Sequence, residues 1–186
     1  MNDYLRSVGG GFAGALRFRG RDRRARFWPY AIFVFGLGQI VGMAAMTPAL
    51  LRFQLEMLQR SGRLPGDGGP YGEMQAMIPF LSDTMRLGAL IGAVTVALLA
   101  AAVVRRLHDC DRTGAWGLLP LPFPGAAAIL ANRAVVGVAS SSRPDMSAFA
   151  GLFANNLVYM AALGWLIYLL VGEGTPGSNR FGPPPQ

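Results

Sequence analysis

The sequence predicts an all-α fold, a polytopic transmembrane helical bundle with four spans and both termini cytoplasmic, in which residues 1–186 form a single membrane domain. Apolar residues make up 52% of the chain and charged residues only 15%, whereas a soluble domain carries about 25% charged residues. The charged residues also avoid four long windows, at 27–51, 87–104, 113–132 and 146–172. This pattern excludes a soluble enzyme, a disordered chain and a disulfide-rich domain.

The first two spans are predicted at residues 27–51 and 87–104. A helix needs roughly 20 apolar residues to cross the hydrocarbon of a bilayer, and the first window exceeds this length. Trp28 lies at its start, where aromatic rings anchor a helix at the head-group level. The second window is shorter, but a helix of that length still rises roughly 27 Å, and Arg105 and Arg106 at its end can extend toward the interface.

The third span, residues 113–139, contains Pro120, Pro122 and Pro124. Each proline lacks an N–H donor and disfavours helix at the residue before it. We therefore expect a broken helix whose continuous part begins near Gly125, and we expect backbone carbonyls before the break to lack helical partners. Three spans plus a re-entrant segment stay open as the alternative. The fourth span, residues 146–172, is long enough to cross with a tilt.

Two connecting segments complete the prediction. Residues 52–86 form a long outer loop whose middle, 61–72, is rich in Gly and Pro and is expected to be irregular. Apolar residues recur at helical spacing on either side of this middle, which predicts two helical extensions lying on the outer membrane surface. The cytoplasmic tail, residues 174–186, is also rich in Gly and Pro and is expected to be extended.

The orientation follows from the arginines. All 17 basic residues are Arg, and with the N-terminus inside, eleven of them lie in cytoplasmic segments. Basic residues favour the cytoplasmic side of a membrane, so both termini are expected there. The charged segment before the first span and the apolar run itself are both too long for a cleaved signal peptide.

Three short motifs fall on the cytoplasmic face: FRGRDRRARFW at 18–28, RRLHDCDRTGAW at 105–116 and GSNRFGP at 177–183. In this order they resemble the YhaH-like bacterial inner-membrane proteins, domain of unknown function family 805. The resemblance extends from Phe18 to Pro183, and the middle motif is its most specific part. It implies a multi-pass protein of the bacterial inner membrane, with no established biochemical role.

The arginines of these motifs predict an anion- or lipid-binding cluster. A planar guanidinium group binds phosphate through two parallel hydrogen bonds, so Arg suits this task. The candidate residues are Arg21, Arg24, Arg105, Arg106, His108, Arg112 and Arg180. The alternative is that these arginines set the topology and attract anionic lipid without forming a defined pocket.

The other motif residues predict a structural role. The membrane topology of the chain requires only positive charge near the ends of the spans. It does not explain the uncharged and acidic residues that lie beside the arginines in the three motifs. We expect the tail to fold back over the loop and form a clasp from Gly20, Asp109, Asn179, Phe181 and Gly182. In this clasp Asp109 should pair with an arginine from another motif, and Asp22 should neutralise further charge.

Catalytic candidates are weak. His108 could act as a general acid or base beside Asp109, but neighbours in sequence seldom orient each other's side chains as a dyad. With one Cys, Cys110, and one His, the chain can form neither an intrachain disulfide nor a structural zinc site. We therefore expect no metal and no cofactor. Nucleic acid is not an expected partner either, because the arginine patch is held against the bilayer.

Two groups of residues inside the spans can join helices. Asn155 and Asn156 lie on the fourth span, where amide side chains either mark a pathway or hydrogen-bond between helices. We predict that one of these amides faces the broken third span. The pairs Gly38–Gly42 and Gly88–Gly92 provide small faces for close helix contact, either within one chain or between chains.

Three functions follow from these features. The leading hypothesis is a protein that binds anionic lipid head groups or a protein partner through its cytoplasmic Arg/His cluster. The alternatives are a small oligomeric transporter or channel, and a membrane-embedded enzyme that acts on a lipid through His108. The lipid bilayer and its anionic phospholipids are the expected partners, and a homo-oligomer stays open.

Overall fold

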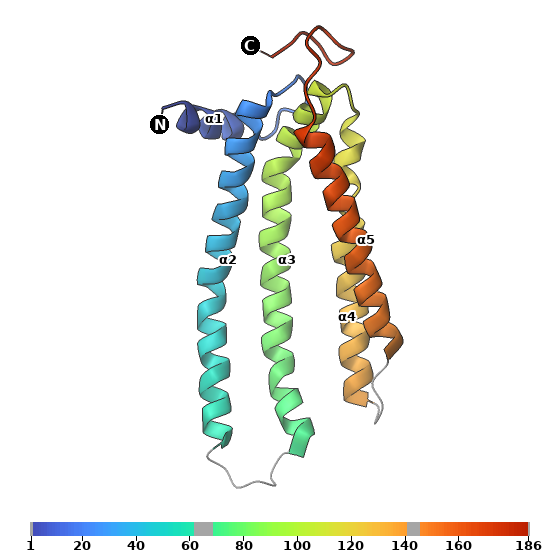
Figure 1. The fold of residues 1–186 in the computed structure, drawn as a ribbon. Coiled ribbons are helices and arrows are strands. Elements are labelled where there is room, and N and C mark those ends of the chain that lie inside the picture. The colour runs from blue at the N-terminus through green and yellow to red at the C-terminus, as the bar shows by residue number, and fades with distance from the viewer. Residues whose placement is uncertain (1, 62–68, 141–145, 186) are drawn as a thin grey trace.

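The computed structural model describes residues 2–61, 69–140 and 146–185. Along the chain these form α1 (Asn2–Ala13), α2 (Arg24–Ser61), α3 (Gly69–Asp109), the short 3-10 helix η1 (Gly114–Leu118), α4 (Pro122–Ser140) and α5 (Met146–Val171). Figure 1 shows α2 to α5 running lengthwise as a bundle, with α1 lying across one end. Both termini lie at that end (Figure 1).

The all-α class is confirmed. Four segments of the described residues are long and apolar enough to cross a membrane: Arg24–Gln59, Pro79–Asp109, Gly114–Val135 and Met146–Val171. The second segment is longer than the predicted 87–104 at both ends, because the helix already includes Pro79 and continues through Arg105 to Asp109. The third segment is of spanning length although its helix is interrupted, which favours four spans over the re-entrant alternative.

The predicted outer loop is mostly helical. α2 continues to Ser61 and α3 begins at Gly69, so both helices extend far into 52–86. The helical extensions are therefore confirmed, but they continue in line with the spans (Figure 1) and do not turn onto the membrane surface. No proline or glycine lies between Pro48 and the end of α2 to turn the helix. Part of the segment predicted to be irregular, 69–72, is helical, and 62–68 lie outside the described residues.

The proline-rich break in the third span is confirmed, with two differences. α4 begins at Pro122, earlier than predicted, because a proline at the first helical position needs no N–H partner. The carbonyls of Trp116 and Leu118, predicted to be unpaired, accept hydrogen bonds from the N–H groups of Leu119 at 3.3 Å and Leu121 at 3.1 Å. A tight 3-10 turn therefore satisfies the backbone that the prolines interrupt.

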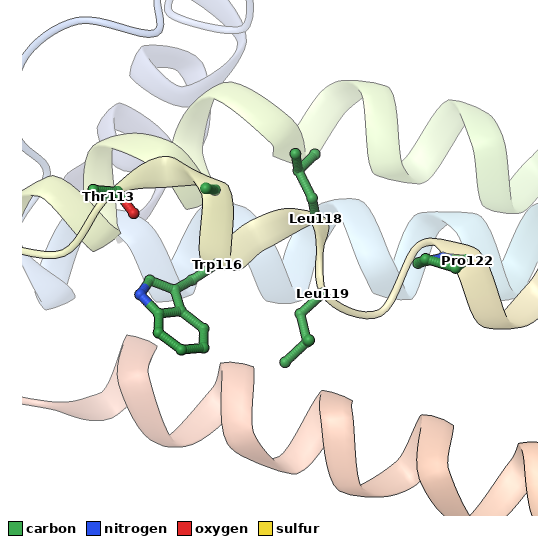
Figure 2. Close-up of a pocket in the computed structure, with 6 residues that line it drawn as sticks. Thr113, Trp116, Leu118, Leu119 and Pro122 are labelled. Carbon is green, nitrogen blue, oxygen red and sulfur yellow. The ribbon is translucent and has the colours of Figure 1, made fainter.

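The short helix η1 lies between two helical hairpins, α2–α3 and α4–α5. Figure 2 shows the side chains of Trp116 and Leu119 pointing toward α5, while Leu118 points toward α3. The Trp116 ring lies 6.4 Å from the ring of Trp165 on α5, measured between centroids. The hairpins are thus joined through η1 at the end of the bundle that carries the termini.

The buried core is concentrated near this same end. Its buried residues come from α2, α3 and α5: Phe27, Tyr30, Val34, Ala102, Leu107, Leu166, Leu169 and Leu170. Much of the remaining apolar surface of the helices is exposed, as expected where lipid takes the place of water as the solvent. The bundle is therefore packed most tightly where the three sequence motifs meet.

The N-terminal helix α1 is a feature that the sequence analysis did not predict. It packs against the start of α2, where Phe12 contacts the Tyr30 ring edge to face at 5.2 Å between centroids. The close approach requires glycine, because a Cβ atom on Gly11 would lie 2.2 Å from the Tyr30 ring. The Tyr30 hydroxyl donates to the carbonyl of Leu98 on α3 at 2.9 Å, which links α1, α2 and α3.

Candidate functional site

Five charged side chains are buried together at the end of the bundle that carries the termini. Each is at most 7% exposed, and Arg106 is completely buried; the residues are Arg21, Asp22, Arg105, Arg106 and Asp109. They come from the segment before α2 and from the last turn of α3. The clasp expected from the sequence therefore includes more residues than predicted. From here on, the clasp means these five charged residues together with the tail segment 174–182 that covers them.

Asp109 is the centre of the clasp. Its Oδ1 accepts a hydrogen bond from Arg21 Nε at 3.1 Å, and its Oδ2 accepts one from Arg106 Nη1 at 2.5 Å. The expected pairing of Asp109 with an arginine from another motif is confirmed by the contact with Arg21. Each carboxylate oxygen therefore has its own guanidinium group, an arrangement that stabilises a buried charge.

A second buried pair joins Asp22 to Arg105, whose Nε donates to Asp22 Oδ2 at 2.7 Å. The Asp22 backbone N–H also donates to the carbonyl of Arg105 at 3.1 Å. The Arg105 guanidinium additionally donates to the carbonyls of Gly14 and Arg17, which follow α1. Asp22 thus neutralises Arg105 as predicted, and Arg105 holds the end of α1 against α3.

Arg106 performs the same task for α5. Its Nε donates to the carbonyl of Leu170 at 2.9 Å, and its Nη2 donates to the carbonyl of Gly172. The last carbonyls of a helix have no partners within the helix and carry partial negative charge. A buried arginine at this position satisfies them, and it fixes the C-terminus of α5 to the end of α3.

The tail folds back over these residues, as the sequence predicted. Arg21 donates to the carbonyls of Thr175 at 2.6 Å, Gly177 at 2.7 Å and Gly182 at 3.3 Å. The approach is closest at Gly174, where a Cβ atom would lie 2.2 Å from Asp109 Oδ2. Only glycine allows the tail to pass this close to the carboxylate.

A tight turn in the tail explains the residues of the third motif. Asn179 and Gly182 exchange backbone hydrogen bonds at 3.1 and 3.0 Å, and Gly182 has a positive φ of 124°, which favours glycine. The Asn179 side chain accepts from the N–H of Phe181 at 2.9 Å and donates to the carbonyl of His108 at 2.9 Å. The predicted clasp residues Asn179, Phe181 and Gly182 therefore lie in one turn.

His108 is half-buried and packs against the tail of the clasp. Its ring stacks on Phe181 with 3.9 Å between centroids, and its Nδ1 lies 3.3 Å from the carbonyl oxygen of Gly20. The carboxylate of Asp109 binds Arg21 and Arg106, so both of its oxygens are engaged away from the imidazole. These contacts assign His108 a place in the packing between the first and third motifs.

The predicted anion-binding residues separate into two groups. Arg21, Arg105 and Arg106 are buried and donate to protein carboxylates and carbonyls, so their guanidinium groups are already occupied. We therefore infer a structural role for these three arginines, and His108, which stacks on Phe181, belongs with them. The others, Arg24, Arg112 and Arg180, are exposed, and so are four that the sequence analysis left out, Arg17, Arg19, Arg23 and Arg26. We call these seven residues the outer arginines.

Some outer arginines have partners at the protein surface. Arg24 donates to the carbonyl of Val171 and to Glu173, both at 3.3 Å. Arg180 donates to Asp111 at 3.2 Å, and its guanidinium lies 4.8 Å from the centroid of the Phe181 ring. Exposed pairs of this kind contribute little to stability, so their arginines can exchange partners readily.

Nucleophilic and metal chemistry have little support at this site. Burial raises the pKa of the Cys110 thiol, an effect that nearby Arg106 only partly opposes, so the thiol is protonated at neutral pH and is a poor nucleophile. Among the described residues, no group of three or more His, Cys, Asp and Glu side chains could hold a metal ion.

Within the spans, one of the two predicted amides faces the broken third span. Asn155 Nδ2 on α5 donates to the carbonyl of Phe123 at the start of α4, at 3.2 Å. This geometry confirms the predicted contact. The side chain of Asn156 is exposed on the bundle surface. Asn155 is therefore the amide of the two that bonds to α4, beside a ring contact between Phe123 and Tyr159 at 6.2 Å between centroids.

Comparison with known proteins agrees with the membrane character of the fold. Residues 15–183 match a family described as a protein of unknown function (DUF805). Inner membrane protein YhaI of Escherichia coli K12 is 23% identical over 171 residues, which cover 91% of this chain and 86% of the relative. Inner membrane protein YhaH of the same strain is 27% identical over 176 residues, covering 91% and 87%. No solved structure gives a significant match.

Proposed function

The chain belongs to the DUF805 family and is a multi-pass inner-membrane protein, and we propose that it binds anionic phospholipid head groups through the outer arginines. In this proposal the clasp is the rigid support and the outer arginines are the binding surface. The termini and the clasp lie on the cytoplasmic side, where the positive charge of the chain is concentrated.

The observation that carries the proposal is the division of the arginines between two environments. Buried Asp22 and Asp109 neutralise part of the charge of Arg21, Arg105 and Arg106, and backbone carbonyls satisfy much of the rest. The seven outer arginines remain exposed on the same end of the bundle. Each basic residue near an anionic bilayer surface contributes about 1 kcal/mol of attraction.

The orientation of α1 supports a lipid-binding surface at this end of the bundle. The helix lies across the bundle (Figure 1), and Tyr4, Leu5 and Phe12 on it are exposed. A helix with exposed apolar side chains that runs across the spans at their end suits the plane of the lipid interface. The outer arginines then lie at the level of the phosphate groups.

Lipid titration observed by native mass spectrometry tests the proposal. The wild type is expected to bind phosphatidylglycerol more tightly than phosphatidylcholine, and added salt should reduce the difference. A variant with Arg19→Gln, Arg23→Gln and Arg112→Gln should lose most of this preference. These side chains are exposed and lie outside the buried ion pairs of the clasp, so the fold should be retained.

The matched control removes three arginines from the opposite end of the bundle: Arg52→Gln, Arg86→Gln and Arg133→Gln. It changes the net charge by the same amount and should keep the preference for phosphatidylglycerol. If the control loses as much preference as the first variant, the overall charge of the protein explains the binding and the proposed surface is wrong.

A further inference from the structure

A groove between the two hairpins has no part in the proposed function. It has a volume of about 590 Å³ and is lined by residues of α2, α3, η1, α4 and α5. The lining is almost entirely apolar and includes Gly42, Gly88, Gly92, Val96, Leu121 and Pro124. Apart from Phe18, which lies before α2, the lining residues belong to the four candidate spans, so the groove lies largely within the membrane.

The groove exists because the hairpins pack within themselves more closely than against each other. Gly38 is in close contact with α3, since a Cβ atom there would lie 2.9 Å from Thr95 Oγ1. A Cβ atom on Gly88 or Gly92, in contrast, would meet no atom within 4 Å. Of the two predicted alternatives, contact within the chain is therefore not seen at these two glycines, and both border open space.

Hydrocarbon is the natural occupant of such a space. In a bilayer the surrounding solvent is acyl chain, and an unfilled apolar cavity loses the dispersion contacts of its walls. Along α3 the lining runs from Leu87 to Val104, which is roughly 25 Å at the rise of an α-helix. This exceeds the hydrocarbon depth of one leaflet, about 15 Å, so a complete acyl chain fits along the groove.

The end of the groove near the clasp carries positive charge. Phe18 and Gly114 line this end. The exposed outer arginine Arg19 follows Phe18 directly, and Arg112 lies two residues before Gly114. The contact between Gly20 and His108 at 3.3 Å holds the segment of Arg19 against the end of α3, from which the chain continues to Arg112. A phosphate at the membrane surface above the groove would therefore meet two guanidinium groups.

We propose that the groove binds one acyl chain of an anionic phospholipid whose phosphate is held by Arg19 and Arg112. The inference rests on the proposed function, because it assigns to one lipid a defined position on the surface of the outer arginines. The groove supplies affinity through the chain, and the arginines supply selectivity for a negative head group. The two contributions can be removed separately.

Gly92→Leu tests the groove. The new side chain enters open space and occupies the path of the acyl chain, so the fraction of protein that retains phosphatidylglycerol through detergent purification should fall about tenfold or more. Gly36→Leu is the matched control on the neighbouring helix, because its Cβ atom also meets nothing within 4 Å and Gly36 does not line the groove. The control should retain lipid as the wild type does.

The outcomes separate the groove from the proposed function. If Gly92→Leu retains as much phosphatidylglycerol as the wild type, the proposal that the groove binds an acyl chain is wrong. The head-group proposal would still be supported if replacing Arg19, Arg23 and Arg112 removes the preference for phosphatidylglycerol. A wild-type dimer that becomes a monomer in Gly92→Leu would show that a second copy fills the groove, and it would also overturn the lipid proposal. If Gly92→Leu does not fold, Gly88→Leu provides the same test from the preceding turn of α3.

Discussion

Asp109 illustrates how much of this structure depends on single residues. Its carboxylate binds Arg21 from one motif and Arg106 from its own helix, and its side chain is only 4% exposed. Its backbone carbonyl also accepts from the N–H of Thr175 at 2.9 Å. One residue therefore connects the segment before α2, the end of α3 and the tail.

Asp109→Asn should lower the free energy of unfolding by about 3–5 kcal/mol, because it leaves two buried guanidinium groups without a counter-charge. Thermal or denaturant unfolding in detergent measures the loss. Asp111→Asn is the matched control: its pair with Arg180 is about half exposed, so the change should cost about 0–1 kcal/mol. Equal losses in the two variants would contradict the central role of the buried pair.

The sequence could predict these pairings but not the full set of partners. Charge balance requires that carboxylates within a group of arginines be paired, which is why the roles of Asp22 and Asp109 were predictable. The carbonyls of Leu170, Gly172 and Gly14 also bind the arginines, and backbone acceptors leave no sign in an amino-acid sequence. For this reason the sequence could not show which arginines stay exposed.

At the scale of the elements, the broken third span was predictable and α1 was not. Prolines interrupt a helix for a local reason, the missing donor and the restricted preceding residue, so the break can be located from sequence. α1 contains Gly9, Gly10 and Gly11 in succession, and glycine is a poor helix former. Packing against Tyr30 compensates for this, and such a tertiary contact is invisible in local propensity.

The hydrogen bond from Asn155 to the first turn of α4 predicts a difference between two adjacent asparagines. Asn155→Leu should destabilise the bundle by about 1 kcal/mol, the usual scale of hydrogen bonds between helices in membranes. Asn156→Leu should have no such effect, because its side chain is exposed on the bundle surface. Unfolding of both variants in the same detergent measures the difference, and a greater loss in Asn156→Leu would contradict the geometry.

At the scale of the whole molecule, the number of spans and their general positions could be predicted because each span is a local feature of the chain. The groove between the hairpins depends on how α2–α3 sits relative to α4–α5, and only tertiary structure determines this. The same Gly-x-x-x-Gly spacing accompanies close packing at Gly38 and open space at Gly92. Spacing alone therefore does not separate a helix contact from a groove wall.

The proposed orientation can be tested on the whole molecule with single cysteines. In a Cys110→Ser background, Asp83→Cys and Ser178→Cys each introduce one exposed thiol at opposite ends of the bundle. With the tail in the cytoplasm, a membrane-impermeant maleimide should label Asp83→Cys in cells whose inner membrane is intact, because only the periplasmic thiol is accessible. It should label Ser178→Cys only after that membrane is disrupted. Labelling of Ser178→Cys in intact cells would show the opposite orientation, in which the outer arginines face the periplasmic leaflet and not the cytoplasmic one.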